Sequence, residues 1–244
     1  MPIKILVSGA FGRMGRFSVE AFNQDNQFKL VGQTGRGYDL KQAIKDSEAD
    51  VVLDFTHPET VYHNALTIIE AGARPVIGTS GLKQEQILSL QDQCKTKHLG
   101  GIIAPNFSLG AVLMMKYACE IVKYLPHVEI IEMHHEEKVD SPSGTALRSA
   151  EILAKHGAKK ANVPGQTRET LPSARGAEAY GIPIHSIRLP GLIARQDILF
   201  GGTGETLTLS HNCIDRQCFM PGVRFACKKV MELEHLIIGL ENLL

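Results

Sequence analysis

The stretch IKILVSGAFGRMG, residues 3–15, decides the fold. It opens with the run Ile3–Val7, which is typical of a buried strand. Glycines follow at three-residue intervals, at Gly9, Gly12 and Gly15, and they permit a tight turn. Apolar residues then recur with a helical period from Met14 to residue 22. A buried strand, a glycine turn and a helix form the first half of a βαβ unit.

The same alternation of strand and helix continues to about residue 105. Short apolar runs are separated by segments in which apolar residues recur at helical spacing. Strand and helix in alternation imply parallel pairing with right-handed crossovers, and continuously apolar strands suit a sheet covered on both faces. We therefore predict a Rossmann-type, doubly wound α/β fold. The expected strands are residues 3–7, 29–33, 51–55, 75–77 and 101–103.

The pattern changes after Asn106. A helical stretch over 108–124 precedes runs that partly alternate between apolar and polar residues, which is typical of a sheet with one solvated face. We predict a second α+β domain with an open mixed sheet over residues 106–215, and a dinucleotide-binding domain over 1–105 that a closing helix within 216–244 completes. Expected strands of the second domain are 128–133, 179–189, 197–200 and 206–211, and 159–176 is expected to be a long exposed loop.

Composition excludes several classes of protein. The 244 residues carry 26 basic and 26 acidic side chains, so no surface for nucleic acid or anionic membrane is expected. No apolar stretch is long enough for a signal peptide or a membrane span. The five cysteines show no Cys-x-x-Cys pair and are interpreted as reduced thiols of a cytoplasmic protein, although Cys213 and Cys218 are close enough in sequence to pair.

The glycine turn is a candidate phosphate site. Free N–H groups at a helix start and the positive end of the helix can hold a pyrophosphate. The spacing is Gly-x-x-Gly-x-x-Gly rather than Gly-x-Gly-x-x-Gly, and a purely structural turn is the alternative. The candidate cofactor-binding residues here are Gly9, Ala10, Phe11, Gly12, Arg13 and Met14.

The second strand suggests which dinucleotide is used. A carboxylate that would read the adenine ribose is expected at its end, but none occurs before Asp39. Arg36 could instead meet a 2′-phosphate, so we predict that NADPH is used at least as well as NADH. The alternative is that Arg36 is a solvated loop residue.

Two further loops follow parallel strands and are expected to line the nicotinamide half of the site. Ordinary turns are the alternative for each. His57, after the third strand, is interpreted as part of a helix start. The candidate residues are Gly78, Thr79, Ser80, Ala104, Pro105, Asn106 and Phe107.

The densest chemical signal is EMHHEEKVDSPSGTA, residues 132–146. A strand runs into two adjacent histidines that face opposite sides, a spacing poorly suited to one metal ion, so no metal is expected. A lysine follows, and a Ser-Pro-Ser-Gly string can begin a helix whose N-terminus receives a carboxylate. This convergence suits proton transfer on a small dicarboxylate. The candidates are His134, His135, Lys138, Ser143, Gly144 and Thr145.

The string Glu-x-His-His-x-x-Lys-x-Asp-x-Pro-Ser-Gly-Thr-Ala resembles that of the dihydrodipicolinate reductase family. The resemblance covers essentially the whole chain, and the other matching segments are 9–15, 54–56, 78–81, 105–108 and 185–188. It implies a homotetramer built by the second domain's sheet. It also implies hydride transfer from NADPH or NADH to a cyclic imine dicarboxylate, in lysine and diaminopimelate synthesis.

By position, the resemblance makes His134 the general acid or base and Lys138 the proton donor, and which of them delivers the proton stays open. It assigns the substrate carboxylates to His135, Ser143, Gly144 and Thr145. Arg188 could add a charge for the substrate, but we interpret it as an ordinary surface arginine. Two alternatives remain: another imine reductase or amino-acid dehydrogenase of Rossmann type, and a non-catalytic NAD(P)-sensing protein.

Overall fold

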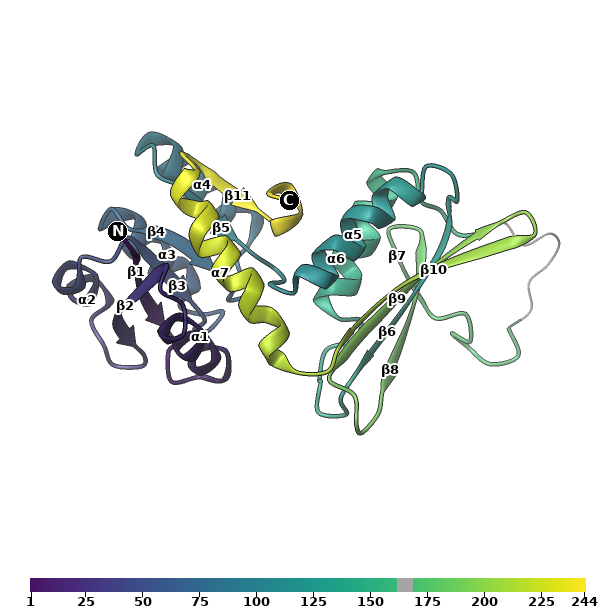
Figure 1. Ribbon diagram of the computed structural model, residues 1–244. Helices are drawn as coiled ribbons and strands as arrows, with labels where there is room; N and C mark the ends of the chain where they lie inside the picture. The colour runs from purple at the N-terminus through teal and green to yellow at the C-terminus, as the bar shows by residue number, and fades with distance from the viewer. Residues whose placement is uncertain (162–168) are drawn as a thin grey trace. The chain divides into compact units, whose positions relative to one another are not determined.

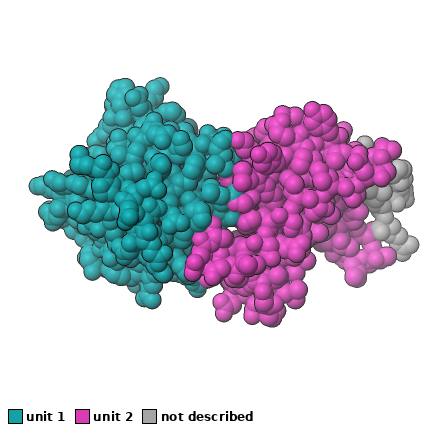
Figure 2. All heavy atoms as spheres, in the orientation of Figure 1, with its two compact units in different colours: residues 1–109, 219–244 teal, residues 110–218 magenta. Residues whose placement is uncertain are grey.

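The structure, a computed structural model, describes residues 1–161 and 169–244. The predicted loop over 159–176 therefore lies partly outside the described residues. The chain forms two compact units, and Figure 2 colours each of them. Unit 1 comprises residues 1–109 and 219–244, and unit 2 comprises residues 110–218.

Unit 1 is built on a six-stranded sheet with the order β11-β5-β4-β3-β1-β2, in which every pair is parallel (Figure 1). Leu6 and its neighbours Ile5 and Val7 are all fully buried although they point to opposite faces. The sheet is therefore covered on both sides, as predicted. The strands are β1 Ile3–Ser8, β2 Phe28–Thr34, β3 Val51–Asp54, β4 Arg74–Ile77, β5 Gly101–Ile103 and β11 Leu236–Ile238.

Five helices cover this sheet. One core cluster joins Leu6 and Val52 of the strands to Ile44, Ile68 and Leu90, one residue from each of three successive helices. The helix after the glycine turn packs beside the helix that follows the return of the chain to unit 1. The helices are α1 Arg13–Asn23, α2 Leu40–Ser47, α3 Val61–Glu70, α4 Gln84–Thr96 and α7 Met220–Lys229.

The C-terminal segment differs from the predicted closing helix. The α-helix ends at Lys229, and after a short 3₁₀ turn, Val230–Glu232, the chain forms β11, which pairs in parallel with β5. The prediction of helix to residue 244 was wrong because a short apolar run fits either period, and pairing with β5 decides between them.

Unit 2 contains a mixed sheet with the order β10-β9-β6-β8-β7. Among the described strands, β6 and β8 pair in parallel and the other pairs are antiparallel, in agreement with the predicted mixed sheet. Helices α5 Leu109–Ile121 and α6 Gly144–Lys155 pack on one face, in a core that includes Ile130, Ile184 and Phe200. The strands are β6 His127–His134, β7 Ala177–Ala179, β8 Ile182–Arg188, β9 Ala194–Gly202 and β10 Glu205–Cys213.

Within the described ranges, no helix combines the length and the apolar character needed to cross a membrane.

Candidate active site

The glycine turn of unit 1 needs glycine for its own packing. Gly9 has φ +81°, and a Cβ there would lie 2.2 Å from the carbonyl oxygen of Phe55. A Cβ on Gly15 would lie 2.1 Å from the carbonyl oxygen of Gly9. Gly12 is the N-cap of α1 and provides no side-chain hydrogen bond, so the first amides of α1 keep their capacity for an anion. This turn fits a dinucleotide phosphate.

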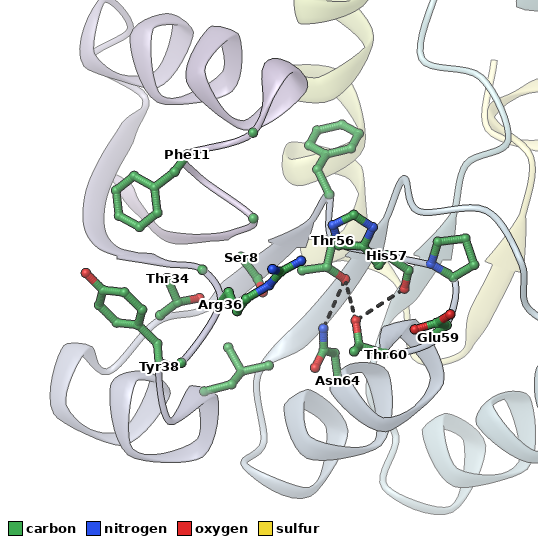
Figure 3. Close-up of a pocket in the computed structure, with 17 residues that line it drawn as sticks. Ser8, Phe11, Thr34, Arg36, Tyr38, Thr56, His57, Glu59, Thr60 and Asn64 are labelled. Atoms are coloured by element: carbon green, nitrogen blue, oxygen red, sulfur yellow. Dashed lines mark hydrogen bonds between the residues drawn. The ribbon is translucent and has the colours of Figure 1, made fainter. Parts of the chain in front are cut away.

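A pocket of about 640 Å³ opens beside this turn (Figure 3). Arg36 lines it and is exposed, while Asp39 accepts a hydrogen bond from the Gln42 amide as the N-cap of α2. The Thr34 hydroxyl is buried at the pocket wall and has no hydrogen-bond partner in the described part of the chain. A pocket with an orphaned hydroxyl and a cation fits a ribose phosphate.

Several lining residues were not predicted as site residues. The carbonyl of His57 accepts from the Thr60 and Val61 amides, as its interpretation as part of a helix start requires, and the residue also lines the pocket. The carboxylate among the lining residues is Glu59, which follows β3 rather than β2. No single motif marks them, since they meet only at the carboxyl edge of the sheet. The unpredicted lining residues are Ser8, Thr34, Gly35, Gly37, Tyr38, Leu40, Phe55, Thr56, His57, Pro58, Glu59, Thr60 and Asn64.

Asp54 holds the loops at this edge together. Its carboxylate is fully buried and accepts from Thr79 Oγ1 at 2.6 Å, Thr56 Oγ1 at 2.8 Å and Asn64 Nδ2 at 2.9 Å. The Thr79 hydroxyl in turn accepts from the Thr56 amide at 2.7 Å. The predicted cofactor residue Thr79 therefore has a structural role in fixing the pocket wall.

Aromatic packing joins the loops that follow β3 and β5, and the loop after β4 lies against both rings. The Phe55 and Phe107 rings pack edge to face with centroids 5.5 Å apart, and a Cβ on Gly78 would lie 2.1 Å from the Phe55 ring. The Ala104 amide donates to the Ile77 carbonyl, and Asn106 Oδ1 accepts from the Ser108 amide. Ser80 and Pro105 are exposed, and none of the residues 78–80 or 104–107 is among those lining the pocket of Figure 3.

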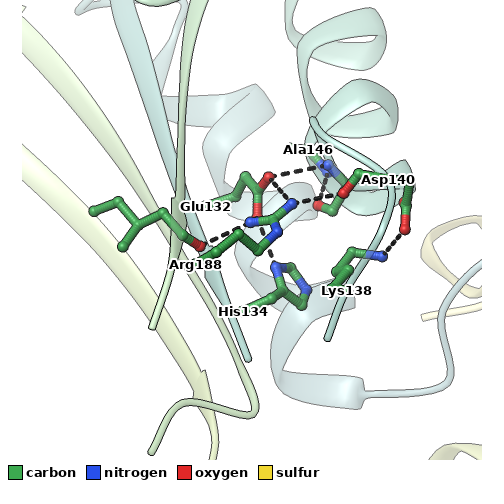
Figure 4. A network of polar contacts seen from close by, with 8 residues as sticks. Glu132, His134, Lys138, Asp140, Ala146 and Arg188 are labelled. Carbon is green, nitrogen blue, oxygen red and sulfur yellow. Dashed lines mark hydrogen bonds and ion pairs between the residues drawn. The ribbon is translucent and has the colours of Figure 1, made fainter. Parts of the chain in front are cut away.

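In unit 2, Glu132 is the centre of a polar network at the end of β6 (Figure 4). Its side chain is fully buried, and Oε2 lies 2.6 Å from His134 Nδ1. Arg188 of β8 donates from both terminal nitrogens to the Glu132 carboxylate, at 2.8 and 2.9 Å. The interpretation of Arg188 as an ordinary surface arginine is therefore wrong, because parallel pairing sets it directly opposite His134.

The electrostatics of this network fix the state of His134. Burial raises the pKa of the Glu132 carboxyl, but hydrogen bonds from His134, Arg188 and Ser186 outweigh it and hold the pKa at about 2. The ionised carboxylate can only accept, so His134 Nδ1 carries a hydrogen. The other ring nitrogen, Nε2, is then the atom available for proton exchange.

Lys138 lies on the loop after β6 and is tied to the same network. Its ammonium donates to Asp140 Oδ1 at 2.6 Å, and this hydrogen bond lowers the pKa of the Asp140 carboxyl. Arg188 Nη2 donates to the Asp140 carbonyl at 2.7 Å, so one guanidinium anchors both Glu132 and the lysine loop. His135 follows the last residue of β6, and its carbonyl accepts from the Lys138 amide.

The start of α6 lies at this network. Ser143 is the N-cap: its Oγ accepts from the Ala146 amide at 3.2 Å, and its own amide donates to Glu132 Oε1 at 3.2 Å. The Ser143 hydroxyl hydrogen remains available to a ligand, whereas its amide hydrogen has a partner. Gly144 is exposed and a Cβ there would meet nothing within 4 Å, so open space borders the first helical amides. Thr145 occupies the second helical position.

The comparisons with known proteins decide the family. Residues 3–107 match the model of the dihydrodipicolinate reductase N-terminus, and residues 110–244 match that of its C-terminus. The chain belongs to the dihydrodipicolinate reductase family. The resemblance found in the sequence is thereby confirmed.

Relatives of this family are similar along their full length. The 4-hydroxy-tetrahydrodipicolinate reductase of Coxiella burnetii (strain Dugway 5J108-111) is 53% identical over 244 residues, covering 100% of both chains. That of Legionella pneumophila (strain Lens) is 52% identical over 245 residues, again covering 100% of both. The dipicolinate-bound dihydrodipicolinate reductase of Paenisporosarcina sp. TG-14 is 40% identical, with a TM-score of 0.91 and coverage of 100% of both chains.

Proposed function

We propose that this dihydrodipicolinate reductase family member reduces 4-hydroxy-tetrahydrodipicolinate to tetrahydrodipicolinate in lysine and diaminopimelate biosynthesis. The substrate gains a hydride and a proton and loses water, and NADPH or NADH becomes NADP⁺ or NAD⁺. The network of Glu132, His134 and Arg188 carries this proposal, because it fixes one histidine tautomer beside a helix start that can receive a carboxylate.

Unit 1 is proposed to bind the cofactor. The turn from Gly9 to Met14 would hold the pyrophosphate, and Arg36 would contact a 2′-phosphate from the pocket wall. The loops over 78–80 and 104–107 would border the nicotinamide, since they follow β4 and β5 at the carboxyl edge of the sheet. When bound, the dihydronicotinamide supplies the hydride.

Unit 2 is proposed to bind the substrate. The Ser143 hydroxyl and the amides of Gly144 and Thr145 would hold one carboxylate at the helix start, and His135 would contact the substrate from the loop. Lys138, an ammonium group on an anchored loop, would donate the proton to the substrate, and His134 would act as the general acid or base through Nε2.

We propose that the enzyme is a cytoplasmic homotetramer. The face of the mixed sheet opposite α5 and α6 supports this, because strand alternation directs Ile131, Met133 and Ile187 to it and all three are partly exposed. Sedimentation velocity should give the mass of four chains, and a monomer at micromolar concentration would contradict the tetramer.

The activity is tested with substrate made in place by the preceding synthase, with NADPH and NADH supplied in parallel. Nicotinamide absorbance should fall only when the synthase and this protein are both present. If the protein binds NADPH but does not oxidise it when the substrate is present, the non-catalytic NAD(P)-sensing alternative would hold instead. Oxidation with other cyclic imines but not with this substrate would indicate a different imine reductase.

A further inference from the structure

Two cysteines lie in contact at the end of unit 2. Cys213 is the last residue of β10 and Cys218 lies in the 3₁₀ turn Arg216–Phe219, and their Sγ atoms are 2.9 Å apart. A disulfide bond is about 2.05 Å long and non-bonded sulfur atoms ordinarily lie farther apart than this pair, so a small approach would join them.

The chain between the two cysteines already has the shape of a closed loop. The Cys218 amide donates to the Asp215 carbonyl at 3.0 Å, and Cys213 Sγ contacts the same carbonyl oxygen at 3.3 Å. The Gln217 amide donates to Asp215 Oδ1 at 2.7 Å. These contacts through Asp215 fix the segment between the two thiols. The described residues contain no group of three or more side chains that could hold a metal ion.

Exposure separates Cys218 from the other four cysteines. All five lie in the described ranges, and Cys218 alone is not buried. Burial raises the pKa of the Cys94 thiol to about 11 and raises that of Cys227 as well, which keeps both as unreactive thiols. An oxidant in solution can therefore reach Cys218, and Cys213 lies close enough to form the disulfide with it.

We propose that Cys213 and Cys218 form a reversible intrachain disulfide in the presence of a small-molecule disulfide. The Cys218 thiolate attacks one sulfur of the oxidant, and the other half leaves as a thiolate that takes up a proton. The Cys213 thiolate then attacks Cys218 Sγ and displaces the second half. The protein loses two hydrogen atoms, and the oxidant is reduced to two thiols. The bond closes the segment through which the chain returns to unit 1, which resumes at Phe219.

Peptide mapping tests this proposal on the full-length protein. The protein is incubated with oxidised glutathione, alkylated and digested with trypsin without reduction. Trypsin cleaves after Arg195, Arg216 and Arg224, so Cys213 and Cys218 fall on separate peptides, 196–216 and 217–224. We expect these two peptides to be joined in most of the protein, and to separate after dithiothreitol.

Variants sharpen the result. Cys213→Ser should leave Cys218 carrying one glutathione, whereas Cys94→Ala, a matched removal of a buried thiol, should keep the joined peptides. Wild-type protein in which Cys218 stays alkylated, or carries glutathione without joining 196–216, would overturn the proposal. A disulfide between two different chains would overturn the proposal too. Both of these results are obtained with the wild-type protein and do not depend on whether a variant folds.

Discussion

Replacing Glu132 by glutamine should destabilise unit 2, because it removes the buried negative charge that pairs with Arg188 and His134. The substitution keeps the size of the side chain but removes the negative charge that faces Arg188, whose side chain is 19% exposed. Arg188 cannot lose its proton, so its charge would stay in unit 2 without an ion partner. Glutamine can also present N–H rather than oxygen to His134 Nδ1, so the tautomer of His134 would no longer be fixed.

The structure gives the size of the effect. The pKa of the Glu132 carboxyl is lowered from 4.5 to about 2, which corresponds to about 3 kcal/mol of stabilisation at neutral pH at 1.36 kcal/mol per unit. Breaking a buried ion pair by removing one partner costs about 3–5 kcal/mol. The first value lies at the lower end of this range, and for a chain of this size about 3 kcal/mol corresponds to a fall in Tm of about 6–12 °C.

The sign of the pH dependence follows from the lowered pKa. Ionised Glu132 stabilises the fold fully above pH 4.5, and this stabilisation is lost as the pH falls towards about 2. Circular dichroism melting curves should thus show a constant difference in Tm between wild type and Glu132→Gln above pH 4.5, which shrinks below it. Turnover at neutral pH should fall by about two decades, the scale of lost acid–base help.

A matched control separates charge burial from the loss of any carboxylate. Glu151 of α6 also pairs with two cations, Arg148 at 3.0 Å and Lys155 at 2.6 Å, but its side chain is 28% exposed and the Lys155 side chain is 66% exposed. Glu151→Gln should lower stability by less than about 1 kcal/mol and leave turnover unchanged. Equal losses of Tm in the two variants, or wild-type turnover in Glu132→Gln, would refute the reasoning.

Four further substitutions test other parts of the site, and a fifth, at Gly72, serves as a control. Alanine at His134 or Lys138 should lower turnover by roughly two to four decades while NADPH binding, followed by fluorescence titration, is spared. Arg36→Ala should raise the KM for NADPH by about tenfold, as expected for a lost charge-assisted hydrogen bond, and leave that for NADH unchanged; equal behaviour of the two cofactors would remove its role. Gly9→Ala, with its Cβ 2.2 Å from a carbonyl oxygen, should abolish cofactor binding or folding of unit 1. Gly72→Ala, at φ +80° with nothing within 4 Å, should lower stability by only about 1–2 kcal/mol.

The parallel sheet could be predicted because each of its first five strands is a short apolar run followed by turn chemistry. The sixth strand could not. Residues 236–238 are apolar in a segment whose other apolar residues recur at helical spacing, and only pairing with Gly101–Ile103, far away in sequence, makes them a strand. Periodicity describes one segment at a time, whereas β11 depends on a neighbour.

The same limit applies to the site. Residues 132–146 could be identified from sequence because the chemistry lies within one short stretch, and the Ser143 cap follows from its place before a helix. Arg188 joins this stretch only through the register that pairs His134 with Arg188 and Glu132 with Ser186. A one-residue slip would turn Arg188 to the opposite face of the sheet and leave Glu132 without its cation.

The buried charge of Glu132 has a further consequence for how the site works. A buried ion pair adds little stability compared with apolar side chains of the same volume, so stability alone does not account for a carboxylate here. What apolar residues cannot do is accept hydrogen bonds at once from His134, Arg188 and the Ser143 amide. One carboxylate thereby fixes the histidine tautomer and holds the guanidinium and the start of α6 in place. The same guanidinium holds the loop of Lys138 through the Asp140 carbonyl, so the position of the proposed proton donor depends on Glu132 through Arg188.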